Sequence, residues 1–362
     1  MEIPPAGRFV SYSPCPSFRQ NGARICFPCP TEKGFVMTAF AALSPAPHAA
    51  IRPNVAGRTM RAVLIGHGVV GGGVAERLPA GVALQAIVVR TRRDACPKGV
   101  PVFTDIAEAL SLKPDLVIEA LPGGALAERV VEQAVSQGAH VVSANKAVLA
   151  RRGDLVDTAR AKGRRVLYSA AVGGGVPVLE TLAAARVKGR EIIGVKGVVN
   201  GTSNFVLDRL ASGQSLDEAV KAAQEAGFAE ADPSADLDGD DAAAKLSLIA
   251  RTAWGIEIDP DTIARQSIRD LAPGFAAKAA REGRKLRQVA RLARSGGGVH
   301  AAIRLDLVDA DSVFYRTRDE GNAIVIQLQD APGIVLTGKG AGRVPTAASM
   351  IGDIRRLLAE QR

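Results

Sequence analysis

Six acidic residues lie within the twelve positions from Glu230 to Asp241, in the stretch GFAEADPSADLDGDDAAAK that ends at Lys245. The lysine follows the last aspartate by four positions, so the two side chains share one face of a helix. Carboxylates in this arrangement could hold the ammonium group of a substrate, and the lysine could move a proton at a reacting oxygen. A capped surface helix with one salt bridge explains the same spacing and stays open as an alternative.

A second lysine, Lys146, follows Asn145 two residues after the strand expected at 140–143. Residues at the carboxyl ends of parallel strands face the ligand crevice, so both are expected beside bound molecules. Reduction of a carbonyl group builds negative charge on its oxygen, and a proton donor with positive charge nearby would stabilise it. Lys146 and Lys245 are therefore the candidate catalytic residues. A solvated lysine at a helix start is the competing interpretation of Lys146.

A glycine-rich turn is expected to bind a dinucleotide cofactor, which could supply a hydride to the carbonyl group. The β-branched run 61–65 leads into GHGVVGGG at residues 66–73, and a helical run follows. In this context the first glycine makes the turn, the second lets the backbone approach the pyrophosphate, and the third lets helix and strand close up. A purely structural turn is the alternative. The expected cofactor contacts at the helix N-terminus are Gly66, Gly68, Val69, Val70 and Gly71.

The second strand, 84–89, ends where an acidic residue would bind the ribose hydroxyl groups of NAD. This chain has Arg90, Thr91, Arg92 and Arg93 there. Guanidinium groups suit a 2′-phosphate, so NADP is favoured over NAD, with Arg90 and Arg92 as the expected contacts. Exposed arginines unrelated to the cofactor remain the alternative.

The chain of 362 residues is long enough for two domains, and its 47% of hydrophobic residues supports a large core. Its net charge of +9 admits an anionic partner, but no basic run interleaved with aromatic residues favours nucleic acid. No stretch reaches the roughly 18 apolar residues of a membrane span. The cysteines are Cys15, Cys26, Cys29 and Cys96, and one C-F-P-C pair is weak evidence for zinc. A cytoplasmic protein is expected.

The pattern A-x3-G-F-A-E-A-D-P-x2-D-L-x-G-x-D-x3-K, from Ala223 to Lys245, resembles the signature of homoserine dehydrogenases. The turn Asn200-Gly-Thr-Ser-Asn204 resembles the NGT-x-N segment of this family. The glycine-rich turn 338–342 resembles its C-terminal segment, which returns to the cofactor domain near the nicotinamide. The resemblance extends over residues 60–362 through four separate motifs.

This resemblance implies a Rossmann-like α/β domain with an inserted α+β domain for substrate binding and dimerisation. The implied division is 60–195 completed by 336–362 for the cofactor domain, and 196–335 for the inserted domain. The implied activity is the reversible reduction of L-aspartate 4-semialdehyde to L-homoserine with NADP or NAD, by a homodimer. The implied substrate-binding residues are Glu230, Asp241, Thr202 and Asn200. Asn145, Lys146 and Gly340 are the further residues implied near the nicotinamide.

The loop after the strand 166–168 departs from the family. A monovalent cation is bound there by backbone carbonyl groups in some relatives, and Val172, Gly174 and Val176 are the matching residues. Ser169 stands where the family has an acidic residue, which puts the cation in doubt. The departure also keeps open another NADP-dependent oxidoreductase of this scaffold, acting on a different small amino or hydroxy acid. A non-catalytic dinucleotide-binding protein is the other alternative.

The two ends of the chain carry further expectations. Residues 1–59 are rich in Pro, Ser, Arg and Phe and lack regular periodicity, so we expect a disordered or misassigned extension before Met60. An acid-poor leader of this kind can also be a transit peptide. The region from about 260 to about 295 is expected to be helical. The chain is expected to be a short form of the family, without a C-terminal regulatory domain.

Overall fold

The computed structural model describes residues 18–20, 23–25, 59–91, 96–296 and 298–360. It divides into two compact units, Met1–Val36 and Met37–Arg362. In the first unit, strands β1 (Phe18–Gln20) and β2 (Ala23–Ile25) pair antiparallel. The expectation for the remainder of residues 1–58 lies outside the described residues.

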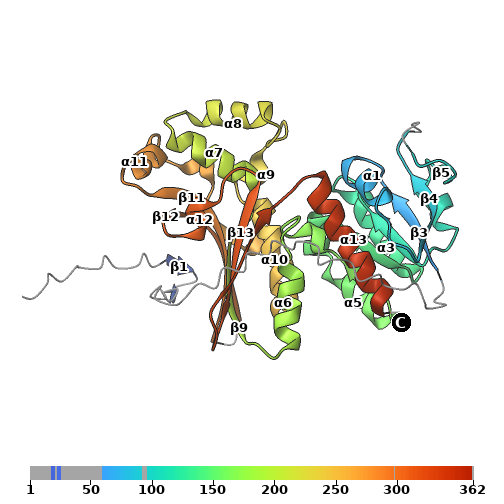
Figure 1. Cartoon of the computed structure of the whole chain (residues 1–362). Helices are drawn as coiled ribbons and strands as arrows, with labels where there is room; N and C mark the ends of the chain where they lie inside the picture. Colours follow the sequence, from blue (N-terminus) through green and yellow to red (C-terminus); the bar gives the residue numbers. More distant parts are fainter. Residues whose placement is uncertain (1–17, 21–22, 26–58, 92–95, 297, 361–362) are drawn as a thin grey trace, which may run out of the picture. The chain divides into compact units, whose positions relative to one another are not determined.

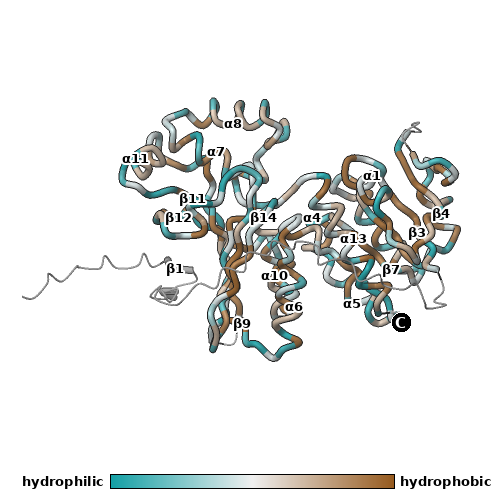
Figure 2. Tube along the Cα trace, viewed as in Figure 1, coloured by the Kyte–Doolittle hydropathy of each residue, from teal (hydrophilic) through white to brown (hydrophobic). Residues whose placement is uncertain are grey.

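The second unit contains a six-stranded sheet in the order β5-β4-β3-β6-β7-β8, in which every neighbouring pair is parallel. Figure 1 labels its strands β3, β4 and β5. This order reverses between β3 and β6, which is the arrangement of dinucleotide-binding sheets. The strands β3 and β4 are predominantly hydrophobic, as their brown colour in Figure 2 shows, because helices cover both faces. The expected Rossmann-like fold is confirmed. The strands are β3 (Met60–Ile65), β4 (Val82–Val88), β5 (Val102–Phe103), β6 (Leu116–Glu119), β7 (His140–Ser143) and β8 (Val166–Leu167).

Helices connect these strands and place the loops that follow them at one edge of the sheet. The last helix, α13 (Arg343–Glu360), returns from the far end of the chain and packs beside α1 on the parallel sheet. Its buried residues Met350 and Ile354 share a hydrophobic cluster with Met60 and Leu64 of β3. The connecting helices are α1 (Val69–Ala75), α2 (Ile106–Leu110), α3 (Ala125–Ser136), α4 (Lys146–Arg151) and α5 (Gly153–Ala161).

A second, mixed sheet has the order β10-β12-β11-β9-β13-β14. The expectation of helices up to residue 295 is wrong, because residues 285–295 form a strand that pairs with β12 and β9. The apolar residues of this strand also fit a helical spacing, and pairing on both edges decided in favour of the sheet. The strands are β9 (Ile192–Val198), β10 (Ala264–Arg265), β11 (Lys285–Ser295), β12 (Gly298–Val308), β13 (Gly321–Leu328) and β14 (Ile334–Lys339).

The helix that carries the acidic stretch, α10 (Asp240–Trp254), is buried along most of its length. Its N-cap is Gly239, with φ at +85° and no capping side chain, so none of the preceding aspartates caps this helix. Asp240 and Asp241 lie in the first turn, where negative charge favours the helix dipole. The other helices of this region are α6 (Val178–Val187), α7 (Gly201–Ala211), α8 (Leu216–Glu225), α9 (Ser234–Leu237), α11 (Phe275–Arg281) and α12 (Val313–Arg316). Short 3-10 turns are η1 (Ser169–Ala171), η2 (Pro260–Thr262) and η3 (Ile268–Asp270).

Among the described helices, none combines the length and apolar character needed to cross a lipid bilayer. The described residues also contain no group of three or more His, Cys, Asp or Glu side chains placed to hold a metal ion. Cys96 is a free thiol, whereas Cys15, Cys26 and Cys29 lie outside the described residues.

Candidate active site

A cleft of about 1800 Å³ lies where the loops of the parallel sheet meet α10, the start of α7 and the start of α13. Such a volume holds a dinucleotide together with a small substrate. Most residues singled out from the sequence lie on its wall. These are Val70, Asn145, Lys146, Gly174, Val176, Asn200, Thr202, Glu230, Asp241, Lys245 and Gly340.

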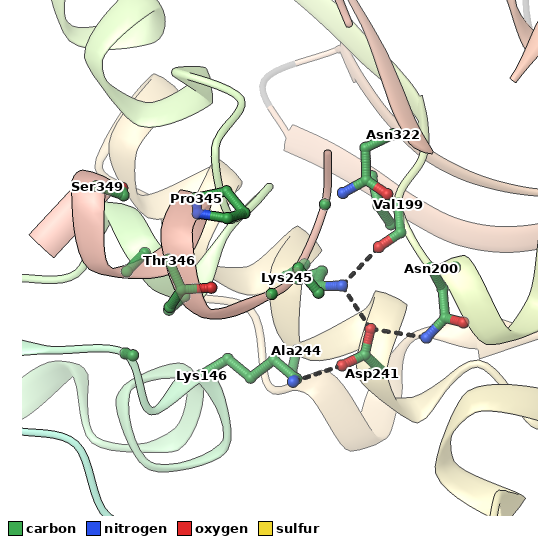
Figure 3. A pocket seen from close by; sticks show the side chains of 18 of the residues that line it. Lys146, Val199, Asn200, Asp241, Ala244, Lys245, Asn322, Pro345, Thr346 and Ser349 are labelled. Atoms are coloured by element: carbon green, nitrogen blue, oxygen red, sulfur yellow. Dashed lines mark hydrogen bonds and ion pairs between the residues drawn. The ribbon is translucent and has the colours of Figure 1, made fainter. Parts of the chain in front are cut away.

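The carboxylate of Asp241 joins the two lysines (Figure 3). Its Oδ1 lies 2.8 Å from Nζ of Lys146, and its Oδ2 lies 2.6 Å from Nζ of Lys245. Lys245 also donates to the carbonyl oxygen of Val199, at 2.5 Å. Lys245 is buried, whereas the side chain of Lys146 is 41% exposed and reaches the cleft from α4. Helix α10 thus supplies Asp241 and Lys245, helix α4 supplies Lys146, and the one carboxylate holds both ammonium groups.

Electrostatic attraction favours the charged forms of Asp241 and Lys146. The carboxylate of Asp241 raises the pKa of Lys146 above its usual range, against the opposing effect of burial. Burial by itself would raise the pKa of Asp241, but the ammonium groups of Lys245 and Lys146 hold it well below its usual range. Burial raises the pKa of the nearby Asp236, and a hydrogen bond from Asn200 opposes this effect.

Asn200 and Thr202 organise the wall opposite α4. Asn200 caps α7 by accepting from the Ser203 N–H at 2.8 Å. Its Nδ2 donates to Asp241 at 3.0 Å and to Asp236 at 2.6 Å, so the cap also orients the central carboxylate. The hydroxyl of Thr202 donates to the carbonyl oxygen of Phe228 at 2.6 Å, which leaves its oxygen lone pairs for a ligand.

The remaining acidic residues separate into two groups. Glu230 lies on the cleft wall with an exposed side chain. Asp238 pairs with Arg269, and Asp240 pairs with Arg265. These two aspartates are therefore held by arginines of the segment 265–269, and Asp240 and Arg265 also line the cleft.

The first glycine turn has little room for side chains. Gly66 has φ at +96°, and a Cβ atom there would lie 2.6 Å from the carbonyl oxygen of Ala120. At Gly71 a Cβ atom would lie 1.9 Å from the carbonyl oxygen of Gly66. At Gly68 a Cβ atom would meet no protein atom within 4 Å, and φ is −86°. The first and third glycines are therefore required by packing, whereas the second leaves open space above the turn.

This difference predicts opposite behaviour for two alanine variants. We expect Gly71→Ala to lower the free energy of unfolding by about 1–3 kcal/mol, because the added methyl group overlaps the backbone. We expect Gly68→Ala to keep the wild-type melting temperature and to raise KM for the dinucleotide on the order of tenfold, equivalent to about 1.4 kcal/mol. Thermal unfolding and steady-state kinetics of both variants check this. An unchanged KM in Gly68→Ala would show that the cofactor lies elsewhere.

The other cofactor residues predicted from the sequence lie in differing environments. Val69 is 67% exposed at the first turn of α1, and Arg90 is exposed at the end of β4. Arg92 lies outside the described residues. Asn145 is buried, and its N–H donates to the hydroxyl of Ser143 at 3.0 Å.

Gly340 is packed between two other parts of the cleft. A Cβ atom at Gly174 would lie 2.3 Å from the carbonyl oxygen of Gly340, and a Cβ atom at Gly340 would lie 2.3 Å from the amide of Asn322. The Gly175 N–H donates to the carbonyl oxygen of Lys339 at 3.0 Å. The C-terminal turn and the loop after β8 are thus held together as one wall.

Two residues that line the cleft, Asn322 and Arg343, and one buried residue outside its lining, Asp353, were missed from the sequence. Asn322 is buried, and neither amide atom has a hydrogen-bond partner among the described residues, so it offers a donor and an acceptor. Asp353 accepts from the N–H and the hydroxyl of Ser169, at 2.9 and 2.7 Å, and pairs with Arg356. Arg343 lines the cleft and pairs with Glu76. These side chains come from segments that are distant in the sequence, and no local motif predicts that they belong to the site.

Burial raises the pKa of Asp353 to about 6, against the attraction of Arg356. Its contacts with Ser169 bring a carboxyl group from α13 to the position where the sequence lacks one. Two of the three carbonyl groups expected to bind a cation, those of Val172 and Gly174, accept no backbone hydrogen bond among the described loop contacts, whereas that of Val176 accepts from the Val178 N–H. The residues therefore fit a cation in part.

Two family models match this chain. The model described as homoserine dehydrogenase matches residues 177–354, and the model of the homoserine dehydrogenase NAD-binding domain matches residues 66–169. A homoserine dehydrogenase of Synechocystis sp. is 33% identical over 315 residues, which cover 82% of this chain and 72% of that protein. One of Pseudomonas aeruginosa is 31% identical over 306 residues, which cover 80% and 70%.

Solved structures agree with these sequence relatives. The crystal structure of a homoserine dehydrogenase from Thiobacillus denitrificans is 29% identical, with a TM-score of 0.78, covering 84% of this chain and 75% of that chain. The parallel sheet, the cleft and these matches define an oxidoreductase that uses a nicotinamide dinucleotide. The homoserine dehydrogenase model covers the substrate side of the cleft, because residues 177–354 include α10 and the turn at Asn200. This match narrows the class of oxidoreductase to one family. The chain belongs to the homoserine dehydrogenase family.

Proposed function

We propose that Lys146 and Lys245 carry out the proton transfer when L-aspartate 4-semialdehyde is reduced to L-homoserine in this cleft. The dihydronicotinamide supplies a hydride to the aldehyde carbon when it is bound. The carbonyl oxygen then takes a proton from one of the two ammonium groups, which becomes a neutral amine, and both groups stabilise the negative charge as it develops on the oxygen. The observation that carries this proposal is the single carboxylate of Asp241 between the two ammonium groups. Homoserine oxidation uses the same groups in reverse.

The substrate amino group would be bound by the acidic side of the cleft. Glu230 lies exposed at the wall, and Asp241 lines the cleft while it accepts from Asn200 and pairs with Lys146. Thr202 at the start of α7 would contact the carboxylate end of the substrate, where helix N–H groups favour an anion. Charge complementarity therefore fixes both ends of the amino acid and leaves the aldehyde near the lysines.

We expect NADP to be preferred over NAD, with Arg90 contacting the 2′-phosphate. A hyperthermophilic archaeal homoserine dehydrogenase of the same fold has been solved in complex with NADPH. The test compares NADPH and NADH oxidation with aspartate semialdehyde in the wild type and in Arg90→Ala. We expect KM for NADPH to rise about tenfold, the scale of a hydrogen bond to a charged group, with NADH unaffected. Arg129→Ala, an exposed arginine on α3, is the matched control. Equal KM changes for both dinucleotides would contradict the assignment.

Four further assignments belong to this proposal. A monovalent cation bound by the carbonyl groups of Val172, Gly174 and Val176 would make the melting temperature depend on K⁺ or Na⁺ at constant ionic strength. A homodimer would show twice the chain mass of 37.6 kDa in light scattering. Cytoplasmic location can be checked by cell fractionation. The division into 60–195 with 336–362, and 196–335, would appear as two protected cores in limited proteolysis.

A further inference from the structure

Glu119 ends β6 with a carboxyl group that solvent does not reach, since the residue is 0% exposed. It takes part in none of the ion pairs found among the described residues. A buried carboxyl group is costly unless its oxygens are hydrogen-bonded. Burial raises the pKa of Glu119, against hydrogen bonds from Ser143 and from the Leu121 N–H. The contacts of this group therefore matter more than its charge.

The two oxygens of Glu119 reach the loops of two neighbouring strands. Oε1 accepts from the Leu121 N–H at 2.7 Å, within the loop that follows β6. Oε2 accepts from the hydroxyl of Ser143 at 2.5 Å, at the end of β7. The Ser143 oxygen in turn accepts from the Asn145 N–H at 3.0 Å. Glu119 and Ser143 are direct partners in the parallel register, so the link crosses the sheet by the shortest path.

Both tied loops border the cleft. Leu121 and Asn145 lie on its wall, and Lys146 begins α4 immediately after the tied Asn145 N–H. The Lys146 side chain must then span the cleft to reach Asp241 at 2.8 Å. A half-exposed lysine has many rotamers, so the position of its backbone decides whether its Nζ meets the carboxylate.

We propose that Glu119 is a positioning residue for Lys146, acting through Ser143 and the Asn145 N–H; this rests on the proton-handling role proposed for Lys146. Its function is to hydrogen-bond both loops, and a neutral side chain of the same shape performs it. Glutamine at this position keeps an acceptor for the Leu121 N–H and donates from its NH₂ group to the Ser143 oxygen.

The test compares Glu119→Gln with Glu119→Leu in the full chain. We expect Glu119→Leu to lower kcat about 10- to 100-fold, the scale for residues that orient a functional group. The alkaline limb of its pH–rate profile moves to lower pH, because a displaced Lys146 loses its contact with the Asp241 carboxylate, which raises the pKa of Lys146. Glu119→Gln retains most of kcat and the wild-type limb. Ser143→Ala cuts the same link with Glu119 in place and shifts the limb in the same direction.

Hydrogen exchange at the Asn145 N–H is the readout independent of activity. Faster exchange in Glu119→Leu and Ser143→Ala, with slow exchange in Glu119→Gln, supports the link. A folded Glu119→Leu with the wild-type alkaline limb overturns the proposal. So does a loss of activity in Glu119→Gln equal to that in Glu119→Leu. Lys146→Ala distinguishes a failure of the proposed function of Lys146 from a failure of the positioning role of Glu119. Unchanged turnover in Lys146→Ala refutes the proposed function of Lys146, while the exchange data still report on the hydrogen-bonded link from Glu119 to the Asn145 N–H.

Discussion

Lys245→Ala is expected to lower kcat for aspartate semialdehyde reduction by about 10²- to 10⁴-fold, the range for loss of a general acid. Lys245 is buried and held by Asp241 and the carbonyl oxygen of Val199, so solvent does not replace its ammonium group easily. KM for the dinucleotide should change little, because the glycine turn after β3 is untouched. Stopped-flow and steady-state measurements of NADPH oxidation check both quantities.

Removal of Lys245 also leaves the Val199 carbonyl group without its donor, at a cost of about 1–3 kcal/mol. Lys245→Met, which keeps the length of the side chain, separates this packing effect from loss of the proton donor. Lys221→Ala serves as the control, because that lysine is exposed on α8 and its pairing with Glu225 is loose, at 4.0 Å. Near wild-type turnover in a folded Lys245→Met would refute the catalytic assignment.

Asp241→Asn is expected to reduce both activity and stability, because one substitution removes the anion shared by two lysines. Breaking a buried ion pair on one side costs about 3–5 kcal/mol, and the side chains of Asp241 and Lys245 are 8% and 9% exposed. We expect kcat/KM of Asp241→Asn to fall together with its stability. The alkaline limb of its pH–rate profile should move to lower pH, because the pKa of Lys146 falls. Urea unfolding and pH–rate profiles of the variant measure these effects.

The stability difference should itself depend on pH. The pKa of Asp241 is depressed in the folded protein, so its contribution is fully present above the unfolded value of about 3.9. It is lost as pH falls through the folded value, and wild type and variant should therefore converge only in strong acid. Asp240→Asn is the matched control, since this neighbouring carboxylate pairs with Arg265 at the surface. An equal loss of stability in both variants would contradict the central place given to Asp241.

The sequence alone determined the class of fold and the main candidates of the site. The sequence shows three local patterns: the glycine spacing at 66–71, the short apolar runs of the buried strands, and the motif that ends in Lys245. Such local patterns can be recognised without knowledge of the tertiary structure. The close Cβ distances at Gly66 and Gly71 agree with the roles expected for them from spacing.

The tertiary structure decided what depends on contacts between distant segments. Residues 285–295 have a spacing that suits a helix, yet pairing with β9 and β12 made them a strand. The sequence placed Asp241 beside Lys245, but its second partner, Lys146, begins a helix 95 positions earlier. Asp353 reaches Ser169, and Glu119 joins two strand ends, for the same reason. Burial and hydrogen bonding between elements set these relations, and one-dimensional spacing carries no record of them.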